Sequence, residues 1–135
     1  MSLLARIRAL WERRRPTPLD EWFFVTFDDH TVRLHVEPPG RQAWAAAFTW
    51  ASIVRICFEA ADWCASDSIY VFTSQRPQSY VIPTEAHGGN EFWNEIIRRK
   101  LFDASLAIDA ATTEGRLFCW PPPDDKNAST PCVQK

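Results

Sequence analysis

Cysteine and histidine side chains are the first residues to consider, because both bind metals and both take part in nucleophilic catalysis. The sequence of 135 residues contains four cysteines and three histidines. The residues that could coordinate a zinc ion are Cys57, Cys64, Cys119 and His35. Structural zinc sites usually contain close cysteine pairs such as Cys-x-x-Cys, and the sequence has none. We therefore predict no metal site and no cofactor.

Nucleophilic and acid–base catalysis have equally weak signals. Cys64 and Ser66 fall in a predicted loop, but no motif such as Gly-x-Ser-x-Gly marks a strained nucleophile turn. Paired acids occur in predicted turns or in the tail, where solvated carboxylates are ordinary. These pairs are Asp28-Asp29, Asp62 with Asp67, and Asp124-Asp125. A hydrolase or metal site around Cys64 and His87 is the last of three functional hypotheses. We expect the protein not to be an enzyme.

Phosphate binding is conceivable at Gly88-Gly89, which precedes a predicted helix. A helix N-terminus offers N–H groups and a favourable dipole to an anion. Glu85 and Glu91 flank the glycines, however, and would repel an anion. We favour a flexible hinge that leads into the helix cap.

The predicted loop from Glu59 to Asp67 is the candidate protein-binding site. It places three carboxylates around one tryptophan, and its members are Glu59, Asp62, Trp63 and Asp67. An exposed tryptophan can anchor a partner, and nearby acids add electrostatic steering. Trp63 could equally fold back onto the sheet as one more core aromatic. Both interpretations remain open at this point.

The N-terminal segment is the most basic part of the chain. Its arginines are Arg6, Arg8, Arg13, Arg14 and Arg15. With one glutamate, residues 1–15 carry +4, and because the whole chain carries −2, the remainder carries −6. Apolar residues at helical spacing predict an amphipathic helix here. Such a helix either packs its apolar stripe on the domain or lies on an anionic membrane or a partner.

Several partners and compartments are disfavoured by composition. The net charge is too balanced for nucleic-acid binding, and no apolar run is long enough to span a membrane. Arg6 and Arg8 interrupt any signal-peptide core. Four cysteines are too few for a disulfide scaffold, so we expect all of them, Cys132 included, to be thiols in a reducing compartment. We predict a cytoplasmic protein.

The elements that must position these residues follow from hydrophobic periodicity. Short apolar or alternating runs predict strands over residues 22–27, 31–37, 42–50, 53–59, 69–73, 79–82 and 116–120. A helix is predicted over residues 90–101, with Asn90 as its N-cap, and a shorter helix is predicted to begin at Asp103. Alanines 43, 45 and 47 form a small face that suggests close packing, with the N-terminal helix as the nearest candidate.

Two longer motifs carry a resemblance. The run "SIYVFTSQRPQSYVIPTEAHGG", with a later "LFCW", is similar to an uncharacterised family of small bacterial proteins. The order of Trp50, three apolar strands and an amphipathic helix also resembles the pleckstrin-homology-like pattern of GRAM-type domains. The resemblance implies a bent antiparallel sheet capped by a C-terminal helix. It implies a fold and no activity.

Together these inferences predict an α+β protein with one bent antiparallel sheet, a partial barrel of the pleckstrin-homology-like kind. An N-terminal helix and a C-terminal helix pack on it. We expect a basic amphipathic helix over residues 1–15, a single domain over residues 20–120 and a disordered tail over residues 121–135. The predicted function is non-catalytic protein binding, as in immunity or adaptor proteins of bacteria, toward an unidentified protein partner. The alternative is a peripheral membrane module that uses the basic helix.

Overall fold

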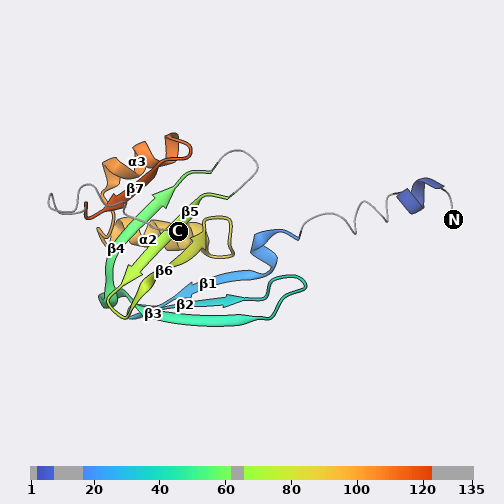
Figure 1. The fold of residues 1–135 in the computed structure, drawn as a ribbon, viewed down its shortest axis with the longest axis horizontal. Helices are drawn as coiled ribbons and strands as arrows, with labels where there is room; N and C mark the ends of the chain where they lie inside the picture. The colour runs from blue at the N-terminus through green and yellow to red at the C-terminus, as the bar shows by residue number, and fades with distance from the viewer. Residues whose placement is uncertain (1–2, 8–16, 62–65, 123–135) are drawn as a thin grey trace.

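The structure is a computed structural model that describes residues 3–7, 17–61 and 66–122. Residues 3–7 are helical. The later elements are, in chain order, η1 (Leu19–Glu21), β1 (Phe23–Phe27), β2 (Thr31–Val36), β3 (Trp44–Thr49), η2 (Trp50–Ser52), β4 (Ile53–Glu59), β5 (Ser68–Thr73), β6 (Arg76–Pro83), α2 (Gly89–Arg98), α3 (Ala104–Thr112) and β7 (Leu117–Trp120). Figure 1 shows their arrangement. The predicted α+β class is confirmed.

The first sheet has the strand order β1-β2-β3 and is antiparallel throughout. Its middle strand follows the alternation that the sequence predicts. Val32, Leu34 and Val36 are buried. Arg33 and His35 are exposed, because successive side chains of a strand point to opposite faces.

The second sheet has the order β6-β5-β4-β7 and is also antiparallel. Ile56 and Phe58 of β4 lie opposite Val71 and Ile69 of β5, and Ile69 pairs with Ile82 of β6. All five side chains are buried. They form the apolar face that this sheet turns toward the core.

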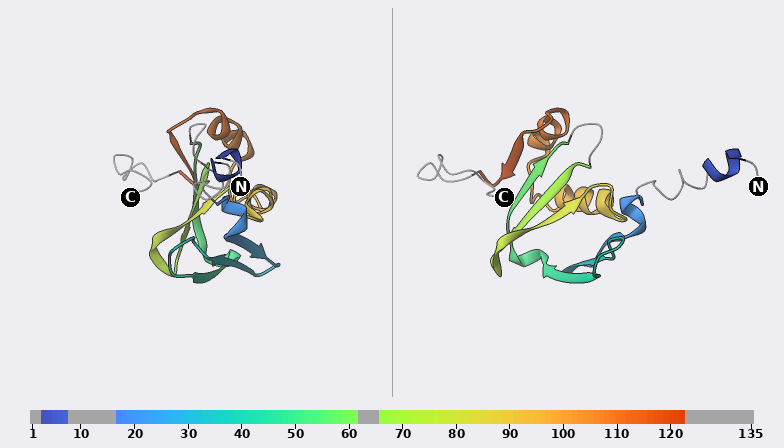
Figure 2. Two further views of the ribbon diagram at one scale, coloured as in Figure 1. Left: turned by 90° about the vertical axis from the view of Figure 1, so that its right-hand side faces the viewer. Right: turned by 45° about the vertical axis from the view of Figure 1, so that its right-hand side comes forward.

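The predicted single bent sheet is wrong: the strands form two sheets joined by one continuous stretch of chain. β3 ends at Thr49, the 3-10 turn η2 follows, and β4 then pairs with β5 instead of β2. Buried Ser52 holds the turn by donating from its hydroxyl to the carbonyl of Thr49 at 2.7 Å. This tight turn interrupts the ladder, so the two sheets lie at an angle to each other (Figures 1 and 2).

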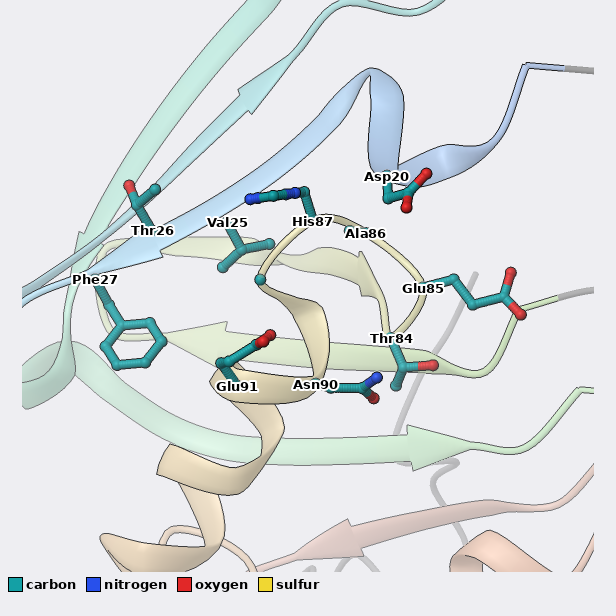
Figure 3. Close-up of a pocket in the computed structure, with 11 residues that line it drawn as sticks. Asp20, Val25, Thr26, Phe27, Thr84, Glu85, Ala86, His87, Asn90 and Glu91 are labelled. Carbon is teal, nitrogen blue, oxygen red and sulfur yellow. The ribbon is translucent and has the colours of Figure 1, made fainter.

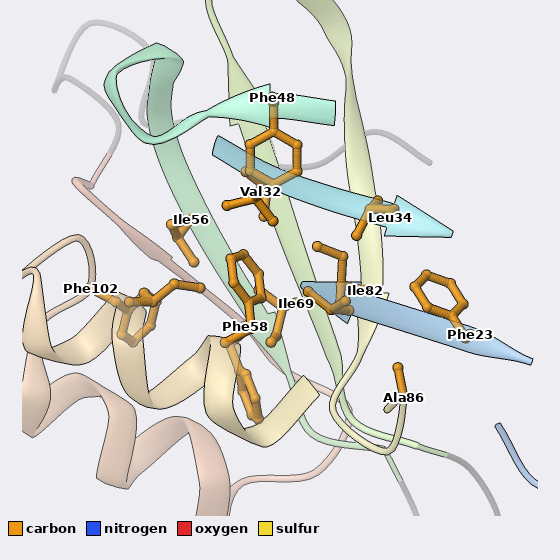
Figure 4. Packing of buried hydrophobic residues seen from close by; sticks show 14 of the residues in the cluster. Phe23, Val32, Leu34, Phe48, Ile56, Phe58, Ile69, Ile82, Ala86 and Phe102 are labelled. Atoms are coloured by element: carbon orange, nitrogen blue, oxygen red, sulfur yellow. The ribbon is translucent and has the colours of Figure 1, made fainter. Parts of the chain in front are cut away.

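Helix α2 lies in the angle between the sheets (Figure 2). Its Phe92 and Ile96 are fully buried. The ring of Phe92 lies 5.6 Å from that of Trp50, centroid to centroid. Residues of both sheets and of α2 belong to one hydrophobic cluster, part of which is drawn in Figure 4. The molecule therefore has a core that neither sheet could form alone.

The expectation that all cysteines are thiols is also wrong. Cys57 and Cys119 form a disulfide between directly opposed residues of β4 and β7. Their Cα atoms lie 4.1 Å apart, although 62 positions separate them in sequence. The pairing of β7 with β4 brings them together, and sequence spacing gives no sign of that pairing. Cys64 and Cys132 lie outside the described residues.

One interpretation expected the N-terminal helix to pack its apolar stripe on the domain, and the described part, residues 3–7, does not do so. Leu3 and Leu4 are 73% and 79% exposed, and Ile7 is 48% exposed. Ala45 and Ala47, on the small face where this helix was expected to pack, are exposed as well. Within the described ranges, no helix has the length and hydropathy needed to cross a membrane.

Candidate functional site

A groove of about 570 Å³ runs beside β1. It is lined by β1, by residues 84–88 and by the first turn of α2. Figure 3 shows Asp20 and Glu85 at one end, and Phe27 and Glu91 at the other. The groove is thus built from two parts of the chain that are distant in sequence, residues 20–27 and residues 84–91.

The loop before α2 is fixed to the edge of β1 by the backbone of His87. Its N–H group donates to the carbonyl of Phe23, and the N–H group of Val25 donates to the carbonyl of His87, both at 2.8 Å. The imidazole also lies against the ring of Phe24, with the two centroids 5.4 Å apart. These contacts hold one wall of the groove against the strand.

Gly88 and Gly89 pack closely where the sequence predicted a flexible hinge. Gly88 is the N-cap of α2 and has a φ of 82°, a region that favours glycine. A Cβ atom on Gly88 would lie 2.2 Å from the carbonyl oxygen of Val25, and one on Gly89 would lie 2.5 Å from that of Thr84. The helix therefore begins earlier than predicted, and Asn90 is not its N-cap.

The edge of β1 remains open at Phe27. Phe23 and Val25 direct backbone groups toward the loop, so the alternation of a strand places the N–H and carbonyl groups of Phe27 on the same edge. Among the described residues, no backbone partner occupies that position. An edge strand with free backbone groups can accept another extended chain.

The charge of the groove is negative. Asp20, Glu85 and Glu91 contribute carboxylates, and all three side chains are exposed. Within the described part of the chain, no lysine or arginine lines it. Among the residues that the structure describes, no group of three or more potential metal ligands is placed to hold a metal ion. Chemically, the groove suits a cationic side chain and disfavours the phosphate considered at Gly88-Gly89.

The predicted loop site is described only at its two ends. Glu59 lies in β4 and accepts a hydrogen bond from the Tyr70 hydroxyl at 3.2 Å. Asp67 accepts one from the backbone N–H of Ala61 at 2.9 Å, which braces the base of the loop. Asp62 and Trp63 lie outside the described residues.

The other predicted residues are dispersed. Arg6 is exposed in the helix at residues 3–7, while Arg8 and arginines 13–15 lie outside the described part of the chain. The His35 imidazole, on β2, pairs with the Glu37 carboxylate at 2.9 Å. Of the groove residues, the sequence analysis singled out His87, Gly88 and the two flanking glutamates, and nothing marked Asp20 or Phe27.

Comparisons of this chain with protein-family models, with curated proteins and with solved structures give no match. The geometry of the groove is therefore the starting point for a functional proposal.

Proposed function

We propose that this protein is a non-catalytic protein-binding module whose groove beside β1 holds a cationic segment of its partner. The observation that carries this proposal is the set of three exposed carboxylates in a groove that, among the described residues, no lysine or arginine lines. Acids arranged in this way increase the association rate of a basic partner and disfavour acidic ones.

The open edge at Phe27 gives the bound segment a conformation as well as a charge. An extended peptide can add to a sheet edge through main-chain hydrogen bonds, while its side chains enter neighbouring pockets. A segment that pairs with Phe27 would pass Glu91 on α2. Arginine is favoured at that position, because its guanidinium pairs with a carboxylate through two parallel hydrogen bonds.

The proposal also includes three predictions from the sequence: the relation to a domain family, the biological role and the cellular location. The relation to pleckstrin-homology-like domains rests on the sequence resemblance and on antiparallel strands against which a helix packs. The single bent sheet that the resemblance implies is not present. A role in bacterial immunity or as an adaptor rests on the analogy with small acidic single-domain proteins. A cytoplasmic location remains proposed on sequence grounds, although disulfides are more usual in oxidising compartments.

The test reverses charge in the groove. We expect Glu85→Lys/Glu91→Lys to weaken binding of an eight-arginine peptide by about tenfold or more, because like charges would then face each other. In the wild-type protein, the peptide should shift amide NMR signals of Thr26, Phe27 and Glu91. The matched control is Asp109→Lys/Glu114→Lys, which reverses two exposed carboxylates elsewhere.

Equal binding by both double variants would overturn the groove as the site. Capture of protein partners from cell lysate, run with the same variants, extends the test to the natural ligand. Trp63→Ala/Asp62→Lys belongs in this series, because the loop with Glu59, Asp62, Trp63 and Asp67 is a second proposed contact. Loss of capture in this variant alone would assign binding to the loop instead of the groove.

A further inference from the structure

The helix at residues 3–7 presents an apolar face that no described part of the protein covers. Leu3 and Leu4 are about three-quarters exposed, and Ile7 is half exposed. Residues three and four positions apart lie side by side on a helix, so these three side chains form one surface. Exposed apolar side chains that are grouped in this way are a feature of surfaces that bind a protein or a membrane.

Positive charge accompanies this apolar surface. Arg6 is exposed in the same helix. The sequence of residues 1–15 carries +4 against −6 for the remainder of the chain. Basic residues beside an apolar helix face are characteristic of segments that lie in the interface of an anionic bilayer.

We propose that Leu3, Leu4 and Ile7 form a membrane-surface anchor for anionic lipid. Their side chains enter the boundary between headgroups and acyl chains, while Arg6 remains at the level of the phosphates. The acidic remainder of the chain is repelled by the same lipid. The bilayer therefore attracts one end of the protein and leaves the rest, including the acidic groove, facing the solvent.

Such an anchor is reversible, since a short apolar face needs the electrostatic contribution to hold. Electrostatic attraction weakens as salt shortens the Debye length from about 10 Å at 0.1 M to about 3 Å at 1 M. Binding should therefore depend on lipid charge, on salt and on the apolar side chains together. No other surface described for this protein predicts all three dependences.

The experiment sediments full-length protein with vesicles of equal parts phosphatidylcholine and phosphatidylserine, and with vesicles of phosphatidylcholine alone. We expect binding to the anionic vesicles only, and its loss at about 1 M salt. Leu4→Glu/Ile7→Glu should weaken binding by more than about tenfold, because two apolar side chains that would enter the bilayer are replaced by charges that anionic lipid repels. The matched control is Ile108→Glu, which changes a 68% exposed isoleucine on α3 and should bind normally.

Binding that is absent, that is equal on neutral vesicles or that survives Leu4→Glu/Ile7→Glu would overturn the proposal. Analytical ultracentrifugation without lipid separates one further outcome. If the wild-type protein self-associates and this variant does not, the surface is a contact between copies of the chain and not a lipid anchor. The groove variant Glu85→Lys/Glu91→Lys should still bind vesicles, so the two proposals can fail independently.

Discussion

Asp28 illustrates how a single carboxylate can fix a turn. Its Oδ1 accepts hydrogen bonds from the backbone N–H groups of His30 and Thr31, each at 2.8 Å, and its Oδ2 pairs with Arg33. These bonds, with the one from His30 contributing most, lower the pKa of Asp28 from 3.8 to about 2. In α2, hydrogen bonds from Arg98 and then Arg99 lower the pKa of Glu95 from 4.5 to about 2.

Both carboxylates predict a loss of stability in acid. A pKa that is lower in the folded state than in the unfolded state stabilises the fold above the unfolded value, and the effect disappears as pH falls through the folded value. We expect carboxyl NMR titrations of Asp28 and Glu95 to have midpoints near pH 2. Asp28→Asn should reduce the acid-dependent part of the unfolding free energy, measured by urea titration between pH 5 and 2. An unchanged pH profile would contradict this assignment.

The role of a single residue was predictable from the sequence where it depends only on neighbouring positions in the chain. Asp103 caps α3 as expected, because its side chain needs only the N–H group of Leu106, three positions along the chain. Asn90 was wrongly assigned as the cap of α2. The actual start depends on Gly88, which has a positive φ and leaves no room for a side chain beside the carbonyl oxygen of Val25 in another element. No local sequence pattern indicates that contact.

At the scale of elements, β7 shows that a strand can be predicted from the sequence while its pairing partner cannot. A strand was predicted over residues 116–120, and it is present as Leu117–Trp120. Its partner could not be predicted, because strand pairing across a long separation leaves no local pattern. Consequently the disulfide between Cys57 and Cys119 was missed, and both cysteines were interpreted as thiols.

The disulfide should contribute substantially to stability. It closes a loop with a sequence separation of 62 residues. The chain-entropy model assigns about 4 kcal/mol to a loop of that length. We expect Cys57→Ala/Cys119→Ala to lower the free energy of unfolding by about that amount in urea titrations under non-reducing conditions.

Cys64→Ala/Cys132→Ala is the matched control, since it retains the disulfide between β4 and β7. Adding a dithiol reductant should destabilise the wild-type protein and leave Cys57→Ala/Cys119→Ala unchanged. A loss below about 1 kcal/mol in that variant would show that the packing of β7 alone holds the strand.

At the scale of the whole molecule, the two sheets depend on a shared core. The ring of Phe92 in α2 lies 6.4 Å from Phe27 of β1 and 6.4 Å from Phe48 of β3, centroid to centroid. From the same helix, the ring of Trp93 lies 4.7 Å from Phe58 of β4. The sequence predicted an apolar stripe on this helix but assigned it to one bent sheet. Hydrophobic periodicity shows which residues are inside and not how many sheets enclose them.

This shared core predicts that the described domain unfolds in one step. Phe92→Ala removes a fully buried ring, and we expect the free energy of unfolding to fall by about 3–5 kcal/mol. Ile108→Ala, at an exposed position of α3, should change it by less than about 0.5 kcal/mol. Within each variant, the unfolding transition followed by tryptophan fluorescence should coincide with the one followed by far-ultraviolet circular dichroism, because neither sheet retains a complete core once the other opens. Two separate transitions would show instead that each sheet is stable by itself and does not require the core that α2 shares with the other sheet.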